Sequence, residues 1–180
     1  VMKVNSTRVM AVPASKLWQG VTSEGHLALA HPYVDQHLHG GSMGLGEKDR
    51  IVYLNGLTFE RQFTAWEEGL GYDLRIGRPN GKSRSLVEWR INSIDSHQSS
   101  LSITVHPDLL RRWPSWLRWV AFRIRVKPQL ESYLDAVTGG IAYWLETGAP
   151  VRRSDHPNHP WFGDVKNQGQ TGTASGFVEQ

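Results

Sequence analysis

The feature that most constrains the fold is a run of six segments with a period of two between residues 33 and 106. Apolar and polar residues alternate within each segment, and glycine-, asparagine-, proline- or serine-containing turns separate them. Alternation of this kind predicts half-buried strands, and the short turns favour antiparallel neighbours. The six predicted strands are "YVDQHLH", "DRIVYLN", "LTFERQFTAW", "LGYDLRIG", "SLVEWRINSI" and "SLSITVH". The sequence therefore predicts an antiparallel meander.

The segments on either side of the meander complete an α+β pattern. "KVNSTRVMAV", which ends before Pro13, predicts one more strand. The stretch from Pro13 to Pro32, interrupted at Gly25, predicts two short helices. From Pro128 onward, apolar residues recur at helical spacing and predict a long C-terminal helix with one apolar face. A helix about 10 Å wide cannot fill the concavity of a strongly curved seven-stranded sheet, so we expect a cavity between them.

The length and composition favour one soluble globular domain. A chain of 180 residues fits one domain, which we predict over residues 1–151, followed by an extended segment and a flexible polar tail over 152–180. No apolar run approaches the ~20 residues needed to span a bilayer, and the first residues do not resemble a signal peptide. The sequence contains no cysteine. Disulfides and thiolate metal sites are thereby excluded, and a cytoplasmic location is expected.

Positive charge is concentrated in one segment. The net charge of the chain is +3. The segment between Pro107 and Pro128 contains six basic residues and one acidic residue, Asp108, so its net charge is +5 and that of the rest of the chain is −2. A general nucleic-acid binder usually spreads its lysines and arginines over a whole face. We therefore expect no nucleic-acid partner.

The same basic segment contains Trp113, Trp116 and Trp119, which share one stripe if the segment is helical. Three interpretations remain open for it. The tryptophans close one end of the cavity, with the arginines as a solvated rim. Alternatively, Trp113, Trp116 and Arg118 make a transient contact with an anionic membrane. The third interpretation is a patch that binds an acidic protein.

The stretch "HPYVDQHLHGG" raises the question of a metal site. His37 and His39 lie two apart, so a strand places both on one face, while Val34 and Leu38 share the opposite, apolar face. We predict that the histidines face solvent, with cavity-lining or metal-binding imidazoles as alternatives. The metal motif of cupins needs a glutamate four or five residues after such a pair, whereas Glu47 follows His39 by eight. We therefore predict no metal and no cofactor.

Four patterns carry a resemblance to a known family. They are "VPASKLWQGVTS", "TFERQFTAWEEGLGYDL", "SLVEWRINSID" with "SLSITVHP", and "YLDAVTGGIAYWLETGAPV". Over about residues 3–151 the chain resembles the SRPBCC or START-like superfamily, in particular its polyketide cyclase/dehydrase-like and lipid-transport-like members. The resemblance implies the helix-grip (Bet v 1-like) fold, a curved seven-stranded antiparallel sheet around a long C-terminal helix with two short helices after strand 1. Members include aromatases and cyclases, hormone and lipid carriers, and chaperone activators, so the fold alone does not assign a function.

Strand parity and the apolar helix face predict which residues line the cavity. Arg61 and Tyr72 stand out among them, because a buried guanidinium or phenol needs a partner such as a ligand carboxylate or carbonyl. Alternatively, the opposite face of this strand points into the cavity, which places Glu60 inside instead of Arg61. The predicted ligand-binding residues are Phe59, Arg61, Phe63, Tyr72, Leu74, Trp89, Ile91, Ile103, Trp119, Leu130, Leu134, Val137 and Ile141.

We predict that the domain binds a small hydrophobic, lipid- or polyketide-like ligand in this cavity. The first alternative is a polyketide cyclase/dehydrase-like enzyme, which needs a general base and a donor for the enolate oxygen. Arg61 and Tyr72 supply donors, but no histidine or carboxylate is expected on the same inward face, so the catalytic residues stay unassigned. The second alternative is a protein-interaction module like the chaperone activators.

Overall fold

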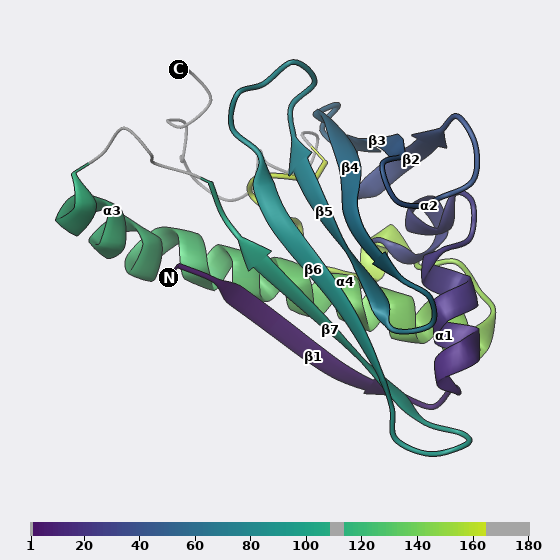
Figure 1. Cartoon of the computed structure of the whole chain (residues 1–180). Coiled ribbons are helices and arrows are strands. Elements are labelled where there is room, and N and C mark those ends of the chain that lie inside the picture. The colour runs from purple at the N-terminus through teal and green to yellow at the C-terminus, as the bar shows by residue number, and fades with distance from the viewer. Residues whose placement is uncertain (1, 109–113, 165–180) are drawn as a thin grey trace.

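A computed structural model describes residues 2–108 and 114–164 of the chain, and its main element is a seven-stranded antiparallel sheet (Figure 1). The order is β1-β7-β6-β5-β4-β3-β2, so β2 to β7 form a meander and β1 joins it beside β7. This confirms the predicted strands and their connections. The strands are β1 (Val4–Met10), β2 (Val34–His39), β3 (Lys48–Tyr53), β4 (Thr58–Glu67), β5 (Gly71–Gly77), β6 (Ser85–Ser93) and β7 (Ser99–His106).

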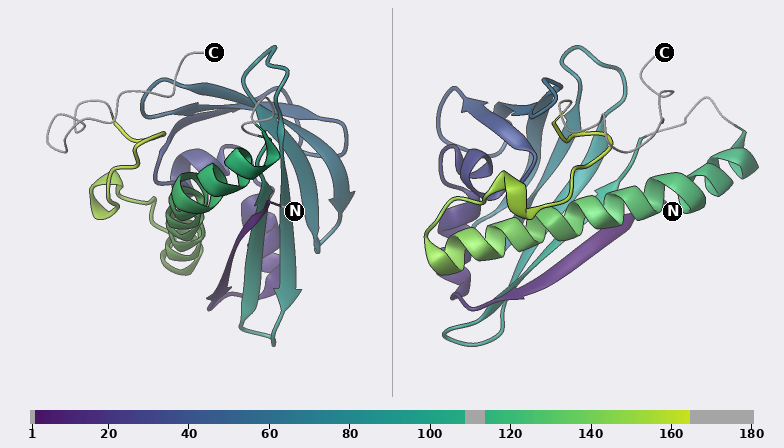
Figure 2. Two further views of the ribbon diagram at one scale, coloured as in Figure 1. Left: turned by 90° about the vertical axis from the view of Figure 1, so that its left-hand side faces the viewer. Right: turned by 180° about the vertical axis from the view of Figure 1, so that it is seen from behind.

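The helices lie on the concave face of the sheet and at its ends. Figure 2 shows the sheet curving around α4, with α1 and α2 at one end and α3 projecting beyond the sheet at the other. The arrangement is the predicted α+β helix-grip architecture. The helices are α1 (Ala14–Val21), α2 (His26–Ala30), α3 (Ser115–Ala121), the π-helical turn η1 (Phe122–Val126), α4 (Lys127–Thr147) and the 3₁₀ turn η2 (Arg153–Asp155).

The C-terminal helical run begins earlier than the sequence predicted. We expected it to start at Pro128, but α3, η1 and α4 follow one another without a break from Ser115. Pro128 has no amide hydrogen, and its ring crowds the carbonyl of Ile124 four residues earlier. The backbone widens into the π-helical turn η1 just before this proline instead of breaking. The basic segment is therefore a helical extension of α4.

The hydrophobic core lies between the concave face of the sheet and α4. Leu134, Val137 and Ile141 on α4 are each at most 2% exposed. Gly140 lets α2 approach this helix closely, because a Cβ atom there would collide with the carbonyl oxygen of Ala30. The close packing fixes α2, and with it the histidines at either end of α2, over the interior.

Two β-bulges reverse the inward and outward alternation within their strands. In β2, Val34 pairs with Tyr53 and Gln36 with Val52, so Asp35 is an extra residue. In β4, Phe63 pairs with Leu74 and Ala65 with Asp73, which makes Thr64 the extra residue. Two residues on either side of a bulge point to the same face of the sheet when their residue numbers differ by an odd number. The bulges therefore turn His37 and Trp66 toward the interior.

The segment after α4 folds back over the β2–β3 side of the sheet. The Tyr33 hydroxyl donates to the carbonyl of Pro157 at 3.1 Å, and Asn55 Nδ2 donates to that of Trp161 at 2.7 Å. Phe162 stacks on Tyr53 with ring centroids 4.4 Å apart. The part of the predicted extended segment that the structure describes, residues 152–164, thus contacts the core. Residues 165–180, which contain the predicted flexible tail, lie outside the described residues. The helices that are described are each too short or too polar to cross a membrane.

Candidate functional site

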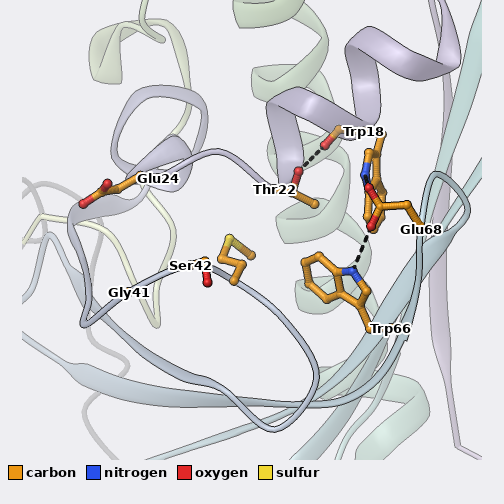
Figure 3. A pocket seen from close by; sticks show the side chains of 8 residues that line it. Trp18, Thr22, Glu24, Gly41, Ser42, Trp66 and Glu68 are labelled. Atoms are coloured by element: carbon orange, nitrogen blue, oxygen red, sulfur yellow. Dashed lines mark hydrogen bonds between the residues drawn. The ribbon is translucent and has the colours of Figure 1, made fainter.

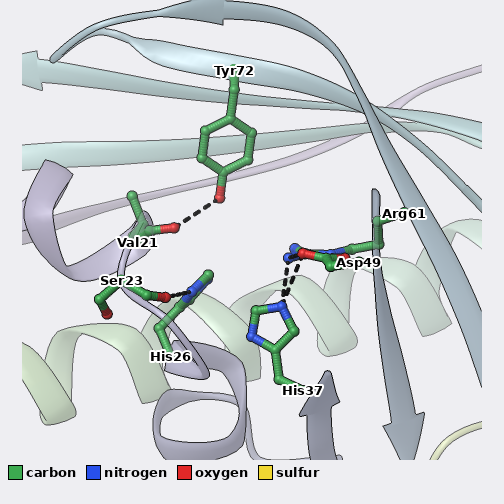
Figure 4. A network of polar contacts seen from close by, with 7 residues as sticks. All are labelled: Val21, Ser23, His26, His37, Asp49, Arg61 and Tyr72. Atoms are coloured by element: carbon green, nitrogen blue, oxygen red, sulfur yellow. Dashed lines mark hydrogen bonds and ion pairs between the residues drawn. The ribbon is translucent and has the colours of Figure 1, made fainter. Parts of the chain in front are cut away.

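An ion pair is buried on the inner face of the sheet, between β3 and β4. Arg61 on β4 lies directly opposite Asp49 on β3, and its side chain is 3% exposed. Its Nε donates to Asp49 Oδ1 at 2.7 Å, and its Nη2 contacts Asp49 Oδ2 at still closer range. His37 on β2 completes the group, with its Nε2 2.9 Å from Asp49 Oδ2 and 3.0 Å from Arg61 Nη2 (Figure 4). Three neighbouring strands therefore supply one buried polar group.

Both members of this pair are charged. Burial by itself raises the pKa of Asp49, but the Arg61 guanidinium and the hydrogen bonds from His37 and Arg61 outweigh it and hold that pKa well below its usual range. Burial likewise lowers the pKa of Arg61, and the Asp49 carboxylate more than compensates, so the pKa is raised. A buried ion pair adds little net stability over an apolar pair of similar volume. Its presence in this interior is therefore a better indication of a site than of a packing requirement.

His26, the first residue of α2, faces the same group. Its Nδ1 lies 2.8 Å from the carbonyl of Ser23, so Nδ1 carries the hydrogen and donates. Burial, and then the charge of Arg61 and the proximity of His37, lower the pKa of His26 well below 6.5, which keeps the ring neutral. Its Nε2 is thus an acceptor, and it has no hydrogen-bond partner among the residues described. The ring packs edge-on against His37, with centroids 5.1 Å apart.

Tyr72 on β5 reaches the group from the other side. Its hydroxyl donates to the carbonyl of Val21 over a long 3.4 Å, and burial raises its pKa, so the phenol stays protonated. Figure 4 shows the side chains of Tyr72, His26 and His37 pointing toward one another from three elements. We call His26, His37, Asp49, Arg61 and Tyr72 the polar cluster. It combines an acceptor imidazole with phenol and guanidinium donors.

Sequence reasoning placed Arg61 and Tyr72 correctly inside but missed the other three members. The prediction that His37 faces solvent is wrong, because the bulge at Asp35 reverses its parity and leaves Leu38 50% exposed instead. The prediction that no histidine or carboxylate faces inward beside Arg61 is also wrong, because both His37 and Asp49 are buried next to it. The side chain of His39 falls outside what the structure describes. The inward position of Asp49 could have been predicted, because alternation places it on the same face of its strand as Ile51 and Tyr53.

A second polar group lies under the C-terminal segment. The amide of Tyr33 donates to His31 Nδ1 at 3.1 Å, so the hydrogen of the neutral ring is on Nε2 and is donated to the Tyr133 hydroxyl at 2.8 Å. Tyr133 in turn donates to the Tyr53 hydroxyl at 2.9 Å. Burial, followed by the charge of Arg61, lowers the pKa of His31 from 6.5 to about 3. This chain of hydrogen bonds is satisfied internally and is covered by His159, whose Nε2 donates to the carbonyl of Gln129 at 3.1 Å.

The predicted ligand-binding residues fall into three groups. Phe59 is half-buried and packs edge-on against Tyr53, and Trp119 is 54% exposed on α3, away from the interior. Tyr72 stacks with Trp89 at 5.3 Å and packs edge-on against Phe63 at 5.3 Å, so these predicted contacts form an aromatic group on the inner face of the sheet. The buried group comprises Arg61, Phe63, Tyr72, Leu74, Trp89, Ile91, Ile103, Leu130, Leu134, Val137 and Ile141.

A half-open pocket of about 600 Å³ lies beside the polar cluster (Figure 3). Trp18 and Trp66 form one wall, and Tyr72 packs behind both rings, with centroid distances of 6.4 Å and 5.5 Å. We call it the aromatic pocket. It lies between the end of α1, the β2–β3 loop and the β4–β5 turn. Its lining residues are Trp18, Thr22, Glu24, Gly41, Ser42, Met43, Trp66 and Glu68.

A second pocket, of about 460 Å³, lies near α3 and is lined by Arg75, Arg84, Leu86, His106, Pro107, Asp108 and Arg118. Neither pocket contains the buried apolar residues that we predicted as ligand contacts. Over residues 2–108 and 114–164, no group of three or more histidine and acidic side chains is arranged to hold a metal ion.

Comparison with known proteins identifies the fold. The START superfamily protein from Mycobacterium smegmatis aligns with a TM-score of 0.63 at 11% identity, covering 82% of this chain and 99% of that one. DynU16, from the dynemicin biosynthetic locus, aligns with a TM-score of 0.63 at 17% identity, covering 83% of this chain and 49% of its own length. The di-domain ARO/CYC protein BexL, from the BE-7585A biosynthetic pathway, aligns with a TM-score of 0.61 at 12% identity, covering 80% of this chain and 47% of its own length.

The chain is therefore a helix-grip domain with the SRPBCC/START-like fold, and it spans about half the length of DynU16 and BexL. At these identities the similarity establishes the fold alone. No family model matches the sequence, and no curated protein matches it significantly.

Proposed function

We propose that this domain binds a small organic molecule that extends from the aromatic pocket to the polar cluster. The observation that carries the proposal is Nε2 of His26, a buried acceptor that no described residue satisfies. An unpaired buried acceptor costs about 1–3 kcal/mol, and a ligand hydroxyl or enol that donated to it would remove this cost. Arg61 and Tyr72, on the other side of the cluster, are donors suited to a carbonyl or carboxylate of the same ligand.

The route into the interior follows the aromatic rings. A pocket of about 600 Å³ has the volume of a typical small-molecule site. Trp66 and Tyr72 separate it from the cluster, so a ligand that displaced these rings would reach His26 and Arg61. Phe63 and Trp89 pack on Tyr72 and remain proposed contacts for an apolar part of the ligand.

The test is to identify a molecule that binds and to remove its proposed acceptor. Native mass spectrometry of the protein purified from its own host should reveal a co-purifying molecule at about one per chain. The His26→Phe variant should melt cooperatively yet bind this molecule about tenfold more weakly or worse, because phenylalanine keeps the ring shape and removes Nε2. His97→Phe, at the exposed β6–β7 turn, is the matched control. Equal retention by His26→Phe would reject the proposal.

A second candidate function is acid–base chemistry on a carbonyl compound, as in a polyketide cyclase or dehydrase. The observation that favours it is the neutral imidazole of His26, a base positioned across from the Tyr72 and Arg61 donors. His26 would remove a proton from the methylene between two ketones, and the donors would stabilise the enolate oxygen. The ARO/CYC designation of BexL supports this choice of reaction. Turnover that His26→Phe abolishes, while binding persists, would distinguish enzyme from carrier.

We also propose that α3 and η1 contact an anionic membrane. Trp116 and Ile124 are 68% and 75% exposed, and the helical run from Ser115 to Lys127 carries four basic residues and no acidic one. Arg123 lies over the ring of Trp119, with 5.1 Å between its Cζ and the ring centroid. Exposed aromatic and basic side chains on one projecting helix suit the headgroup region of anionic lipid. Trp113, the third residue of the predicted contact, lies outside the described residues.

A further inference from the structure

A carboxylate is held between two indoles at the wall of the aromatic pocket. Trp18 Nε1 donates to Glu68 Oε1 at 3.1 Å, and Trp66 Nε1 donates to Oε2 at 3.4 Å (Figure 3). Indole N–H groups are neutral donors. They fix the orientation of the carboxylate and leave its negative charge uncompensated.

The charge of the pocket is one-sided. Its lining residues include no lysine, arginine or histidine, and of its two carboxylates, Glu24 has an interaction of its own and Glu68 is held by the indoles. Other acidic side chains on the sheet form ion pairs, as Glu60 does with Arg84 at 2.8 Å and Asp73 with Arg90 at 2.6 Å. Glu68 has no such ion pair within the described part of the chain.

The two indole rings also attract positive charge. The rings of Trp18 and Trp66 meet edge-to-face, with centroids 5.2 Å apart. The electron-rich face of tryptophan attracts cations more strongly than any other aromatic side chain does, and donation of the N–H to a carboxylate makes the ring richer in electrons still. A pocket that combines these rings with an unpaired carboxylate selects for positive charge.

We propose that the aromatic pocket binds a positively charged ammonium group of the ligand. The inference rests on the proposed function and specifies the ligand further: an amine or quaternary ammonium at the mouth, and an oxygen-bearing part directed toward the polar cluster. The pocket volume of about 600 Å³ accommodates an ammonium group with an attached ring.

The test compares two probes of the same shape. Benzyltrimethylammonium and neopentylbenzene differ in one atom, the charged nitrogen that replaces a quaternary carbon. Isothermal titration calorimetry should give a dissociation constant about tenfold lower for the cation, because only the cation gains the charge-dependent attractions. Glu68→Gln should remove most of this preference while leaving the affinity for the neutral probe unchanged. Glu131→Gln, an equal charge change at the far end of α4, is the control and should have no effect.

The outcomes separate this inference from the proposed function. Equal affinity for the two probes, or no binding of the cation, would overturn the ammonium site. A neutral or anionic co-purifying ligand that His26→Phe releases would also overturn it, while the proposed function would stand. Binding of the cation that depends on Glu68, without any ligand that depends on His26, would support the site and reject the proposed function.

Discussion

Trp66 and Tyr72 lie directly opposite each other in the β4–β5 ladder, and their rings stack with centroids 5.5 Å apart and planes 13° from parallel. Trp66 faces the aromatic pocket, whereas the hydroxyl of Tyr72 ends in the polar cluster. The pocket and the cluster therefore share one wall that is two rings thick. A ligand that moves Trp66 must also change the position of Tyr72.

The shared wall makes Tyr72→Phe an informative variant. The hydroxyl makes one long hydrogen bond, 3.4 Å to the carbonyl of Val21, so its removal should lower the free energy of unfolding by less than about 1 kcal/mol. Affinity for the co-purified ligand should fall roughly tenfold if the hydroxyl donates to it. Urea denaturation and calorimetry measure the two effects, and Tyr143→Phe, at an exposed tyrosine, is the control. Unchanged affinity would remove Tyr72 from the binding site.

Arg61→Met should destabilise the fold strongly. The substitution leaves the Asp49 carboxylate buried without its counterion, which costs about 3–5 kcal/mol in comparable pairs. Adding Asp49→Leu should restore most of that loss, because an apolar pair replaces the ion pair. Urea denaturation of the single and double variants measures both changes. Glu60→Gln, which breaks a partly exposed pair on the other face of β4, should cost less than about 1 kcal/mol.

If instead the double variant is no more stable than Arg61→Met, the charges themselves are required for folding. The view that the pair serves a site would then be wrong.

Stability should fall as the pH drops below about 6.5. His26 and His31 have pKa values lowered in the folded state by burial, so the unfolded chain binds more protons in this range and protonation favours unfolding. Each histidine contributes a slope of up to about 1.4 kcal/mol per pH unit. For His31 the loss continues down to its folded pKa of about 3. Asp49, whose pKa is also lowered, adds to the loss below its unfolded pKa of about 3.9.

The measurement is the free energy of unfolding in urea between pH 7.5 and 4. The variant His31→Gln, which cannot titrate, should show a shallower slope than the wild type. A stability that stays constant from pH 7 to 5 would contradict the buried neutral state of both histidines.

Anionic vesicles should sediment the protein if α3 and η1 contact membranes. Binding to vesicles that contain phosphatidylserine should exceed binding to neutral phosphatidylcholine vesicles, and a few hundred millimolar salt should weaken it by screening. Trp116→Ala combined with Arg118→Ala should weaken it further. Leu29→Ala with Arg152→Ala, an exposed apolar and basic pair elsewhere, is the matched control. If the amount of sedimented protein does not depend on lipid charge or on the Trp116 and Arg118 substitutions, the proposed membrane contact is wrong.

Periodicity in the sequence was sufficient to predict the sheet. The segments from β3 to β7 alternate over most of their length, and turns such as "NG" and "RPNGK" mark their ends, so the meander follows from local pattern. The same pattern favoured Arg61 over Glu60 as the inward residue of β4. The long helix was predicted by the same means from Pro128 onward. Its earlier start was missed, because a proline usually marks a helix boundary and the π-helical turn that accommodates it has no sequence signature.

The site was harder to predict than the fold. Alternation counts residues and cannot register an extra one, so His37, which follows the bulge in β2, was assigned to the wrong face, and the inward turn of Trp66 after the bulge in β4 could not be foreseen. His26 was missed because it belongs to a helix of five residues, too short for a periodic signal. The ligand-binding role of the apolar residues, from Phe59 to Ile141, remains a prediction.

The two bulges also mean that this site is specified by the number of residues in a strand as much as by their identity. Losing Asp35 alone would keep every histidine and every other carboxylate in the chain and yet turn His37 outward, away from Asp49 and Arg61. Losing Thr64 would likewise turn Trp66 away from Glu68 and Tyr72. Single-residue insertions and deletions, which leave composition and overall fold almost untouched, are thus a direct route by which a helix-grip domain can gain or lose a charged interior.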